Sequence, residues 1–562
     1  MTIPSADLGV PGALFGVESR PPAFMVTHLS RRALLGRAGI LLGPVLLSRA
    51  RWAAGEPAPL DVRGFGATGN GKTKDTRAIQ DALDAAGRSG GTIQFPPGEY
   101  VSGTLRLRSR VTLRLAAGAA LIASPDDGDF DPHEELGYDS FADRETTDLS
   151  FALLQGRGLQ QVRIVGPGRI EGNRSRRGGP KPIALKQCGQ IEIHDLTIEN
   201  SPNYNISLLG CDGVDIAGVT IRNGYSDGID PDCCRNVRIV NCRIESRDDA
   251  IVAKTSFALG LRRPTANLLV ADCVLVNVRN ALKLGTESVG DFRNIVFRNC
   301  TITARPERWL PYPDTWKPQP SAGVSLETVD GGRLEQVRVS GITMEGVRAP
   351  IFVKLGRRGK GPPGSAASVL KGVSISDITA TGAQWTSTIT GVPGRPVEDI
   401  SLSGVRITDK GGGRAENLTR EVPEFETRYP DAAMYNDDLP AYGLYCRHVM
   451  GLRLDRIDLR LDKPDPRVAV LLDDVRKADL KAIVATPPAD GASLFWLRSV
   501  RDCVISGSRP RAAARTFVRL SGAESAGVRL AGNDLSQVEQ ASMLDPEVTA
   551  AALRTERNVK RK

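Results

Sequence analysis

Two short segments of the chain contain the side chains best suited to chemistry, and both are rich in aspartate. The first contains Asp227 and Asp230, and the second contains the adjacent pair Asp248 and Asp249. Carboxyl groups held close together can act as general acid and general base, because their environments push their pKa values apart. The same groups could instead hold calcium or form a salt-bridge patch without catalysis. The elements that position them therefore have to be found.

A repeat with a period of about 23 residues spans both segments. Cys188, Cys211 and Cys234 each open a similar phrase of alternating apolar and polar residues, and looser copies follow. Such alternation, with no helix between the strands, indicates a solenoid in which each copy is one turn of a parallel β-helix. The three cysteines would then stack. We interpret them as small core residues, with disulfides between them as the less favoured alternative.

The second strand of each copy allows the turns to be aligned. Its apolar positions share one phase and are expected to point into the core; they are Ile206, Ile229, Ile251, Leu282, Val324 and Ile351. In this alignment Asp227 and Asp249 fall in the same outward column, one turn or ~4.8 Å apart. Stacked like charges are costly and raise a carboxyl pKa, which indicates a functional site. Lys254 and Lys283 are placed where they could partly neutralise the acids.

The N-terminal residues 1–56 lack the alternating pattern of the repeat. Arg31-Arg32 precedes a short apolar run, which resembles a bacterial twin-arginine export signal and is too short to span a bilayer. A buried N-terminal helix is the alternative. We therefore expect a periplasmic or extracellular protein that has no membrane anchor after signal cleavage, with Met25 as its natural start.

The rest of the chain is predicted to be all-β. We expect a single parallel β-helix over residues 57–508, with a short capping helix over 76–86, and a C-terminal cap or extension with a basic tail over 509–562. The net charge of +9 on 562 residues does not imply nucleic acid and suits a polyanionic substrate. The nine cysteines and four histidines form no metal-binding motif, so we expect no metal and no cofactor. The oligomeric state is left open.

The acidic segments resemble glycoside hydrolase family 28, the polygalacturonase family. Residues 225–233 (Tyr-Ser-Asp-Gly-Ile-Asp-Pro-Asp-Cys) and 247–255 (Arg-Asp-Asp-Ala-Ile-Val-Ala-Lys-Thr) are similar to its two acidic motifs. The resemblance implies a right-handed parallel β-helix and an inverting hydrolase that acts on pectin-like galacturonan or rhamnogalacturonan. It implies that Asp248 is the general acid and that Asp227 and Asp249 hold the attacking water. Inversion generally places acid and base ~6.5–9.5 Å apart.

The chain departs from this family at residues expected to bind substrate. The family histidine falls on Asn280, and the Arg-x-Lys pair that grips a uronate falls on Ser325 and Glu327. An acid at that subsite would repel a uronate, which favours a neutral or branched sugar unless Arg279 and Lys283 substitute. Together with these, Asp230 and Lys254 complete the predicted substrate-binding set.

Two segments rich in aromatic residues interrupt the repeat, at 306–320 and 421–442. Aromatic loops beside a solenoid can stack on sugar rings, although local packing explains them equally well. Two other functions stay open. One is a carbohydrate-binding β-helix without activity, and the other is a polysaccharide lyase on the same fold, which would use calcium and an Arg or Lys base.

Overall fold

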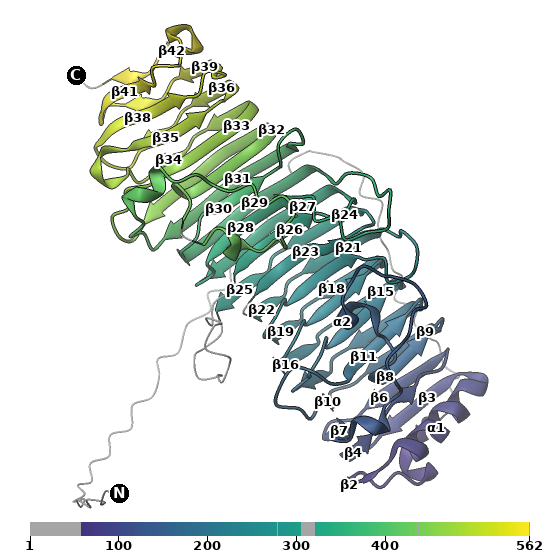
Figure 1. Cartoon of the computed structure of the whole chain (residues 1–562). Helices are drawn as coiled ribbons and strands as arrows, with labels where there is room; N and C mark the ends of the chain where they lie inside the picture. Colours follow the sequence, from purple (N-terminus) through teal and green to yellow (C-terminus); the bar gives the residue numbers. More distant parts are fainter. Residues whose placement is uncertain (1–57, 278, 305–320, 437, 561–562) are drawn as a thin grey trace, which may run out of the picture. The chain divides into compact units, whose positions relative to one another are not determined.

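The structure is a computed structural model that describes residues 58–277, 279–304, 321–436 and 438–560. The predicted export signal and the aromatic segment 306–320 lie outside these residues. The described residues form one long right-handed parallel β-helix (Figure 1), so the predicted fold class is confirmed. Among the described helices, none is both long and apolar enough to cross a membrane.

The strands form three parallel ladders in which each strand pairs with those one turn before and after it. The first ladder contains β5 (Leu105–Arg106), β8 (Ala152–Arg157), β11 (Lys181–Lys186), β14 (Ile206–Leu209), β17 (Ile229–Asp232), β20 (Ile251–Thr255), β23 (Asn280–Ser288), β26 (Ala322–Thr328), β28 (Ala349–Leu355), β30 (Ser387–Thr390), β32 (Ala441–Leu461), β33 (Val468–Lys481), β35 (Ser493–Arg498), β38 (Ala514–Ser521) and β41 (Val538–Leu544).

In each turn, the strand of the second ladder directly follows the strand of the first. It contains β1 (Leu60–Asp61), β3 (Gly91–Phe95), β6 (Val111–Leu115), β9 (Gln160–Val165), β12 (Gly189–His194), β15 (Asp212–Ala217), β18 (Arg235–Val240), β21 (Thr265–Ala271), β24 (Phe292–Arg298), β27 (Arg333–Glu345), β29 (Val369–Ala383), β31 (Val397–Asp409), parts of β32 and β33, β36 (Arg501–Ser506), β39 (Ala526–Ala531) and β42 (Leu553–Glu556).

The third ladder closes each turn, and the long strands β27, β29, β31 and β32 bend into it. Its own strands are β2 (Asn70–Lys74), β4 (Gly98–Ser102), β7 (Ala119–Ala123), β10 (Arg169–Glu171), β13 (Thr197–Glu199), β16 (Thr220–Gly224), β19 (Arg243–Ser246), β22 (Val274–Asn277), β25 (Thr301–Ala304), β34 (Val484–Ala485) and β37 (Arg509–Pro510). Strands β40 (Asp534–Leu535) and β43 (Val559–Lys560) pair with each other in a separate two-stranded sheet.

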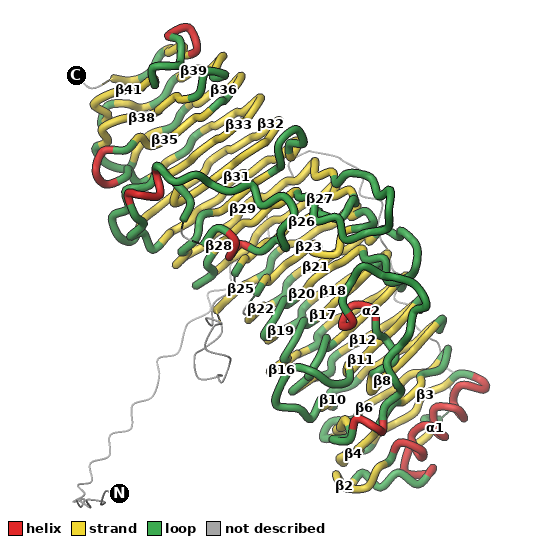
Figure 2. The backbone as a smooth tube through the Cα atoms, in the orientation of Figure 1, coloured by secondary structure: helices red, strands yellow, loops and turns green. Residues whose placement is uncertain are grey.

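Helical segments are few and lie between the strands (Figure 2). They are α1 (Thr76–Ser89), α2 (Arg144–Thr147), and the 3-10 turns η1 (Val62–Phe65), η2 (Asp127–Asp129), η4 (Ala415–Leu418), η5 (Ala432–Met434), η6 (Ala489–Gly491) and η7 (Ala550–Ala552). Helix α1 buries Ile79, Leu83 and two alanines against the first turns of the solenoid. It thereby covers the open end of the core, as the sequence predicts for a capping helix.

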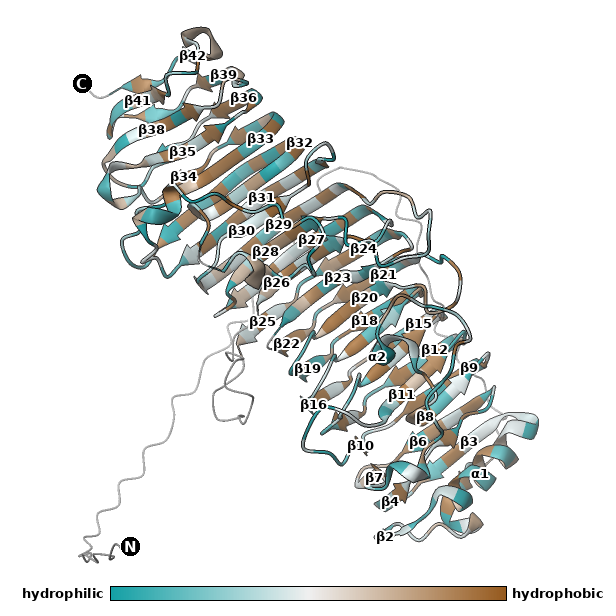
Figure 3. Cartoon of the chain, viewed as in Figure 1, coloured by the Kyte–Doolittle hydropathy of each residue, from teal (hydrophilic) through white to brown (hydrophobic). Residues whose placement is uncertain are grey.

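The register of the first ladder agrees with the sequence alignment. Ile206 pairs with Ile229, which pairs with Ile251, and the column continues through Leu282, Val324 and Ile351. All six are fully buried. Apolar bands cross the strands of successive turns in Figure 3, because side chains in register repeat the same inward position at every turn.

The β-helix extends beyond the predicted end at residue 508. Strands β38 and β41 continue the first ladder, and β39 and β42 continue the second, all with parallel pairing. Residues 514–556 therefore extend the β-helix itself. These turns keep buried apolar side chains, including Phe517, Val518 and Leu520.

The cysteines lie in the core and are all free. Cys188, Cys211 and Cys234 occupy matching positions on successive turns, directly before strands that pair in register. The backbone N–H of Cys211 donates to the Cys234 sulfur at 3.3 Å. This arrangement confirms that they stack as small buried side chains.

Candidate active site

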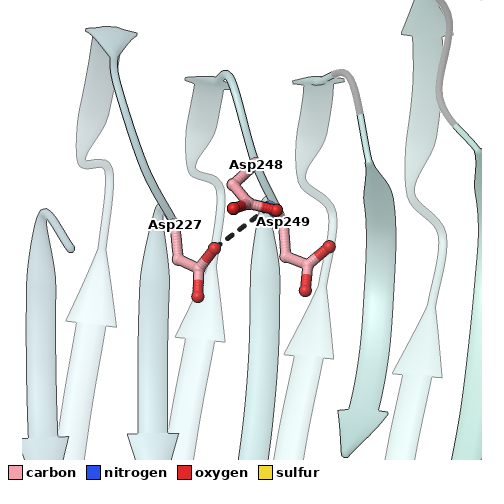
Figure 4. A group of neighbouring side chains, drawn as sticks. All are labelled: Asp227, Asp248 and Asp249. Atoms are coloured by element: carbon pink, nitrogen blue, oxygen red, sulfur yellow. Dashed lines mark hydrogen bonds between the residues drawn. The ribbon is translucent and has the colours of Figure 1, made fainter. Parts of the chain in front are cut away.

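The aspartates Asp227, Asp248 and Asp249 lie together at the start of two neighbouring strands of the first ladder (Figure 4). Asp227 precedes β17 and Asp249 precedes β20, each two residues before a paired core isoleucine. The backbone N–H of Asp249 donates to Oδ1 of Asp227 at 3.2 Å. One carboxylate oxygen from each of the three acids lies within 4.8 Å of the others. The structure thus brings together the three predicted catalytic residues.

Glycine at position 228 permits this close approach of the two turns. A Cβ at Gly228 would lie 2.4 Å from the carbonyl oxygen of Ala250 and 2.5 Å from a methyl group of Ile244. Contacts that short do not occur in folded proteins, so any larger residue would push the strands apart. The Asp-Gly-Ile sequence therefore places a carboxylate directly above the next turn.

Lys254 links Asp227 to Asp230 beneath the acid cluster. Its ammonium lies 3.4 Å from Oδ2 of Asp227, 2.6 Å from Oδ2 of Asp230 and 3.0 Å from the hydroxyl of Tyr204. Burial raises the pKa of Asp227 well above its usual range, helped by Asp248 and Asp249, although Lys254 opposes the shift. Burial also raises the pKa of Asp230, to about 6.

Asp249 has the opposite electrostatic setting. Its Oδ1 accepts hydrogen bonds from both the backbone and side-chain amides of Asn280, at 2.9 and 2.8 Å. Its Oδ2 accepts one from Lys283 at 3.0 Å. Burial alone would raise the pKa of Asp249, but Lys283 and Asn280 outweigh it and lower the pKa. Asp249 is therefore held as a carboxylate.

Asp248 is the most accessible of the three acids. Its side chain is 20% exposed, whereas Asp227 and Asp249 are buried. Arg177, from the connection between β10 and β11, donates to Oδ2 of Asp248 at 2.6 Å and also pairs with Glu145. Burial and the charge of Asp249 raise the pKa of Asp248 although Arg177 opposes them. An accessible carboxyl with a raised pKa can deliver a proton.

Each of the three acids forms an ion pair with a cationic side chain through at least one carboxylate oxygen. Lys254, Lys283 and Arg177 each form an ion pair there. Burial lowers the pKa of both lysines, but the neighbouring carboxylates outweigh it and raise the pKa well above the ordinary value. A divalent cation would have to compete with these charges, so the donor set fits proton transfer better than metal binding.

The predicted substrate-binding residues divide into buried and accessible groups. Asp230, Lys254, Asn280 and Lys283 are at most 4% exposed and contact the acids or one another. These buried residues hold the acids in position through hydrogen bonds and ion pairs. Arg279 is partly exposed and pairs with Asp431 at 3.5 Å.

Glu327 lies deeper than its proposed role suggests. It is fully buried, and its carboxyl accepts hydrogen bonds from Ser325 at 2.6 Å and Thr286 at 2.9 Å. Burial raises its pKa to about 7, against the effect of the nearby Lys283. Repulsion of a uronate by this side chain would therefore act through buried atoms, not by contact at the surface.

Several residues of the site have no signal in the repeat. Arg177 lies in a connecting loop, and Lys181 donates from β11 to the carbonyl oxygens of Glu145 and Asp148, both at 2.6 Å. Tyr429 lies in the predicted aromatic segment 421–442, and its hydroxyl is 3.4 Å from the ammonium of Lys283. One of the two aromatic segments thus reaches the acids. The interruption of the repeat was the only sign of it in the sequence.

Comparison with known proteins shows what this site is similar to. Residues 152–259, which contain all three acids, match the family model of glycosyl hydrolases family 28. Residues 60–119 match the model described as rhamnogalacturonase A/epimerase, pectate lyase-like. The chain is 28% identical to a probable polygalacturonase of Vitis vinifera over 378 residues, which is 61% of this chain and 73% of that protein. These matches support the assignment of the chain to glycoside hydrolase family 28.

Two further similar proteins differ in how much of the chain they cover. An exo-poly-alpha-D-galacturonosidase of Dickeya chrysanthemi is 24% identical over 310 residues, which is 44% of this chain and 50% of that protein. The crystal structure of an exopolygalacturonase from Thermotoga maritima has a TM-score of 0.54 at 21% identity, covering 63% of this chain and 88% of that one. At that identity the likeness shows the shared β-helix.

Proposed function

We propose that this family-28 glycoside hydrolase cleaves O-glycosidic bonds of pectin-like polysaccharide, of the galacturonan or rhamnogalacturonan type. The observation that carries the proposal is the opposite electrostatic setting of two adjacent acids. Asp248 is accessible and has a raised pKa, whereas Asp249 is buried, hydrogen-bonded and has a lowered pKa. Two carboxyl groups whose environments separate their pKa values can act as general acid and general base.

In the proposed mechanism Asp248 donates its proton to the glycosidic oxygen as the bond from that oxygen to the anomeric carbon breaks. Water held by Asp227 and Asp249 attacks the same carbon from the opposite face. The carboxylate of Asp249, with Asp227 beside it, accepts the proton of that water. Lys283 and Lys254 keep the carboxylates in place throughout, because each is bonded to one of them.

This mechanism inverts the anomeric configuration. The acids are more tightly grouped than the ~6.5–9.5 Å that inverting enzymes generally use, since their nearest oxygens lie within 4.8 Å. Both proposed bases are already bonded to lysines, which favours their holding water over forming a covalent glycosyl bond. Proton NMR of the first product formed shows whether the anomeric configuration is inverted or retained. The opposite anomer to the substrate supports inversion, and the same anomer contradicts it.

A panel of substrates tests the proposed function. Release of reducing ends should be measured on polygalacturonate, rhamnogalacturonan backbone and a neutral β-glucan as the unrelated control, with Asp248→Asn as the matched inactive variant. Cleavage of a pectic substrate by the wild type alone supports the proposal. Binding of these polymers without cleavage indicates a carbohydrate-binding β-helix. A calcium-dependent product that absorbs in the ultraviolet indicates a lyase, and either result overturns the proposal.

We also propose export by the twin-arginine route, on the basis of Arg31-Arg32 before the short apolar run. The paired variant Arg31→Lys and Arg32→Lys keeps the charge and removes the motif. Fractionation of cells that produce each form should show the mature protein outside the cytoplasm for the wild type only. Equal export of both forms would contradict the route.

A further inference from the structure

The outward face of the first ladder is covered on both sides of the acids. Every residue of β11, β14, β17, β20, β26 and β28 is buried, so both faces of these strands are covered. In the second ladder, β12 and β15 instead alternate buried residues with exposed or half-exposed ones. A polymer that lay along the solenoid would need the outward side chains of several successive turns to be accessible.

A segment that we call the C-terminal strap, residues 410–436 and 438–440, covers the turns after the acids. Its Val422, Tyr435 and Leu439 belong to one apolar cluster with Phe352 and Tyr445 on the outward face of β28 and β32. Polar contacts hold the strap at the same strands: Lys354 donates to the carbonyl oxygen of Glu424 at 2.9 Å, and Arg447 donates to that of Val422 at 2.7 Å.

The C-terminal strap also reaches back to the acids. Tyr429 contacts Lys283 on β23, and Asp431 pairs with Arg279 directly before that strand. The strap therefore extends from β23, beside Asp249, to β33, where Leu471 belongs to the same apolar cluster. It crosses the first ladder in Figure 2.

A second segment, the N-terminal strap at residues 125–150, covers the turns before the acids. Its Leu149 belongs to an apolar cluster with Ala184 of β11 and Leu209 of β14. Lys186 of β11 pairs with Glu134 of this strap at 2.5 Å. Near the acids, Glu145 of the strap pairs with Arg177, which pairs with Asp248.

Accessible atoms remain at the site, where the N-terminal strap reaches Asp248 through Arg177 and the C-terminal strap reaches Lys283 through Tyr429. Arg177 is 41% exposed at its side chain and Tyr429 is 57% exposed, and Asp248 lies within the same stretch. The N-terminal strap contacts the turns as far as β20, and the C-terminal strap contacts those from β23 onward. A polymer that continued along the solenoid in both directions would have to pass beneath a strap on each side of the acids.

We propose that the enzyme acts at the end of a polysaccharide chain and does not cut internal bonds. The inference rests on the proposed hydrolase function and adds to it that the straps close the path of the polymer on both sides of Asp248. The end of a chain can enter between the straps, whereas an internal sugar unit would need both neighbouring stretches to pass beneath them.

Time-resolved product analysis of the wild-type protein tests this inference. The substrate is an oligogalacturonate or rhamnogalacturonan oligomer of defined length that is labelled at its reducing end. Chain-end action yields one labelled product first, either the oligomer shortened by a fixed unit or the smallest labelled fragment. A ladder of labelled products at the earliest times overturns the inference but leaves hydrolysis intact. No cleavage of any pectic substrate overturns the proposed function itself.

A variant of the C-terminal strap tests whether the strap restricts cleavage to the end of the polysaccharide chain. Residues 427–430, at the tip of the C-terminal strap, are replaced by Gly-Ser-Gly-Ser, which keeps the loop length and the apolar anchors. The same replacement at residues 362–365, a loop that contacts none of the acids, is the matched control. We expect the tip variant to release internal fragments at least several-fold more often than the control. Equal product profiles of the two variants overturn the role of this strap. If the tip variant does not fold, the product profile of the wild type decides whether the enzyme acts at the chain end.

Discussion

Two parts of the first ladder arrange charge in opposite ways. In the C-terminal turns Arg447, Asp473 and Arg498 stack in register, so that cation, anion and cation alternate from strand to strand. Asp473 lies 3.1 Å from Arg447 and 2.9 Å from Arg498. Around β17 and β20, Asp227 and Asp249 instead occupy neighbouring turns of one column. The first arrangement stabilises the solenoid, and the second has a cost in stability.

This difference shows that one group of charges stabilises the fold, whereas the other is arranged for proton transfer. Asp473 forms ion pairs with an arginine on each side, and these pairs support the stack. Four acids that share Lys254, Lys283 and Arg177 compete for the same positive charges, so the pKa values of some rise and that of Asp249 falls. Proton transfer at moderate pH requires this spread. The comparison predicts that substitutions in the two regions have opposite effects on activity and stability.

The largest expected effect is on catalysis at the acid cluster. Asp248→Asn should lower kcat by about 10²–10⁴-fold, because an amide fills the same space but cannot donate the proton. Asp227→Asn and Asp249→Asn should each also be severe. Combining these two should not multiply the losses, because both acids hold the same water. Steady-state kinetics on a pectic substrate, with circular dichroism to confirm the fold, provides the measurement.

The control for these variants is Asp473→Asn in the alternating column. It should leave kcat unchanged and lower the free energy of unfolding by about 1–3 kcal/mol, because two arginines lose a charged partner. Asp227→Asn should keep or slightly raise stability, since it relieves repulsion. Loss of activity in Asp473→Asn with unchanged stability would show that the alternating column serves catalysis and not stability, which would refute the comparison.

Removal of Lys254 should affect both properties. Lys254→Met leaves Asp227 and Asp230 buried without their cation, and breaking a buried pair costs about 3–5 kcal/mol. Denaturant unfolding should show this loss together with reduced kcat. Lys371→Met removes a lysine that is 3.6 Å from Glu335 at the surface, and it should change stability by less than about 0.5 kcal/mol. Similar losses in both variants would contradict the special role of Lys254.

A smaller effect is expected on the pH profile from Arg177→Gln. The general acid works while protonated, so activity is present below the pKa of Asp248 and is lost as the pH rises through it. Arg177 opposes the rise in this pKa, and its removal should move the alkaline limb of kcat/KM upward by about one pH unit. Arg174→Gln, which alters a pair with Asp127 in the same loop, should leave the limb in place. A shift to lower pH would reject Asp248 as the acid.

The smallest effect concerns stability at Glu327. Its pKa is raised from 4.5 to about 7, so its contribution to stability is full below pH 4.5 and is lost as the pH rises through about 7. Thermal unfolding from pH 4 to 8 should therefore show a decline that Glu327→Gln reduces by about 1–3 kcal/mol. Glu539→Gln, on the exposed side of β41, should leave the decline unchanged. A steeper decline in Glu327→Gln would show that the carboxyl is ionised in the fold.

The sequence was sufficient for the fold and for the grouping of the acids, because both follow from a repeat. Ile229 and Ile251 determine the register, and the register places Asp227 beside Asp249. Arg177 and Tyr429 reach the site from loops whose course no periodicity indicates. Glu327 is at the expected position in β26, but the sequence could not show that Ser325 and Thr286 bury it. The last copy of the repeat recognised in the sequence lies at residues 501–505, so the predicted end of the β-helix came too early.

The straps also change how the solenoid holds together. A stack of turns that contact only their neighbours behaves as a one-dimensional array, in which the ends can open without the middle. Residues 125–150 and 410–440 connect turns that are not neighbours, as when Tyr138 donates to the carbonyl oxygen of Ala258 at 2.9 Å and Tyr429 meets Lys283 on β23. The turns around the acids are thereby joined into one cooperative unit, which should keep its form while the outer turns fray.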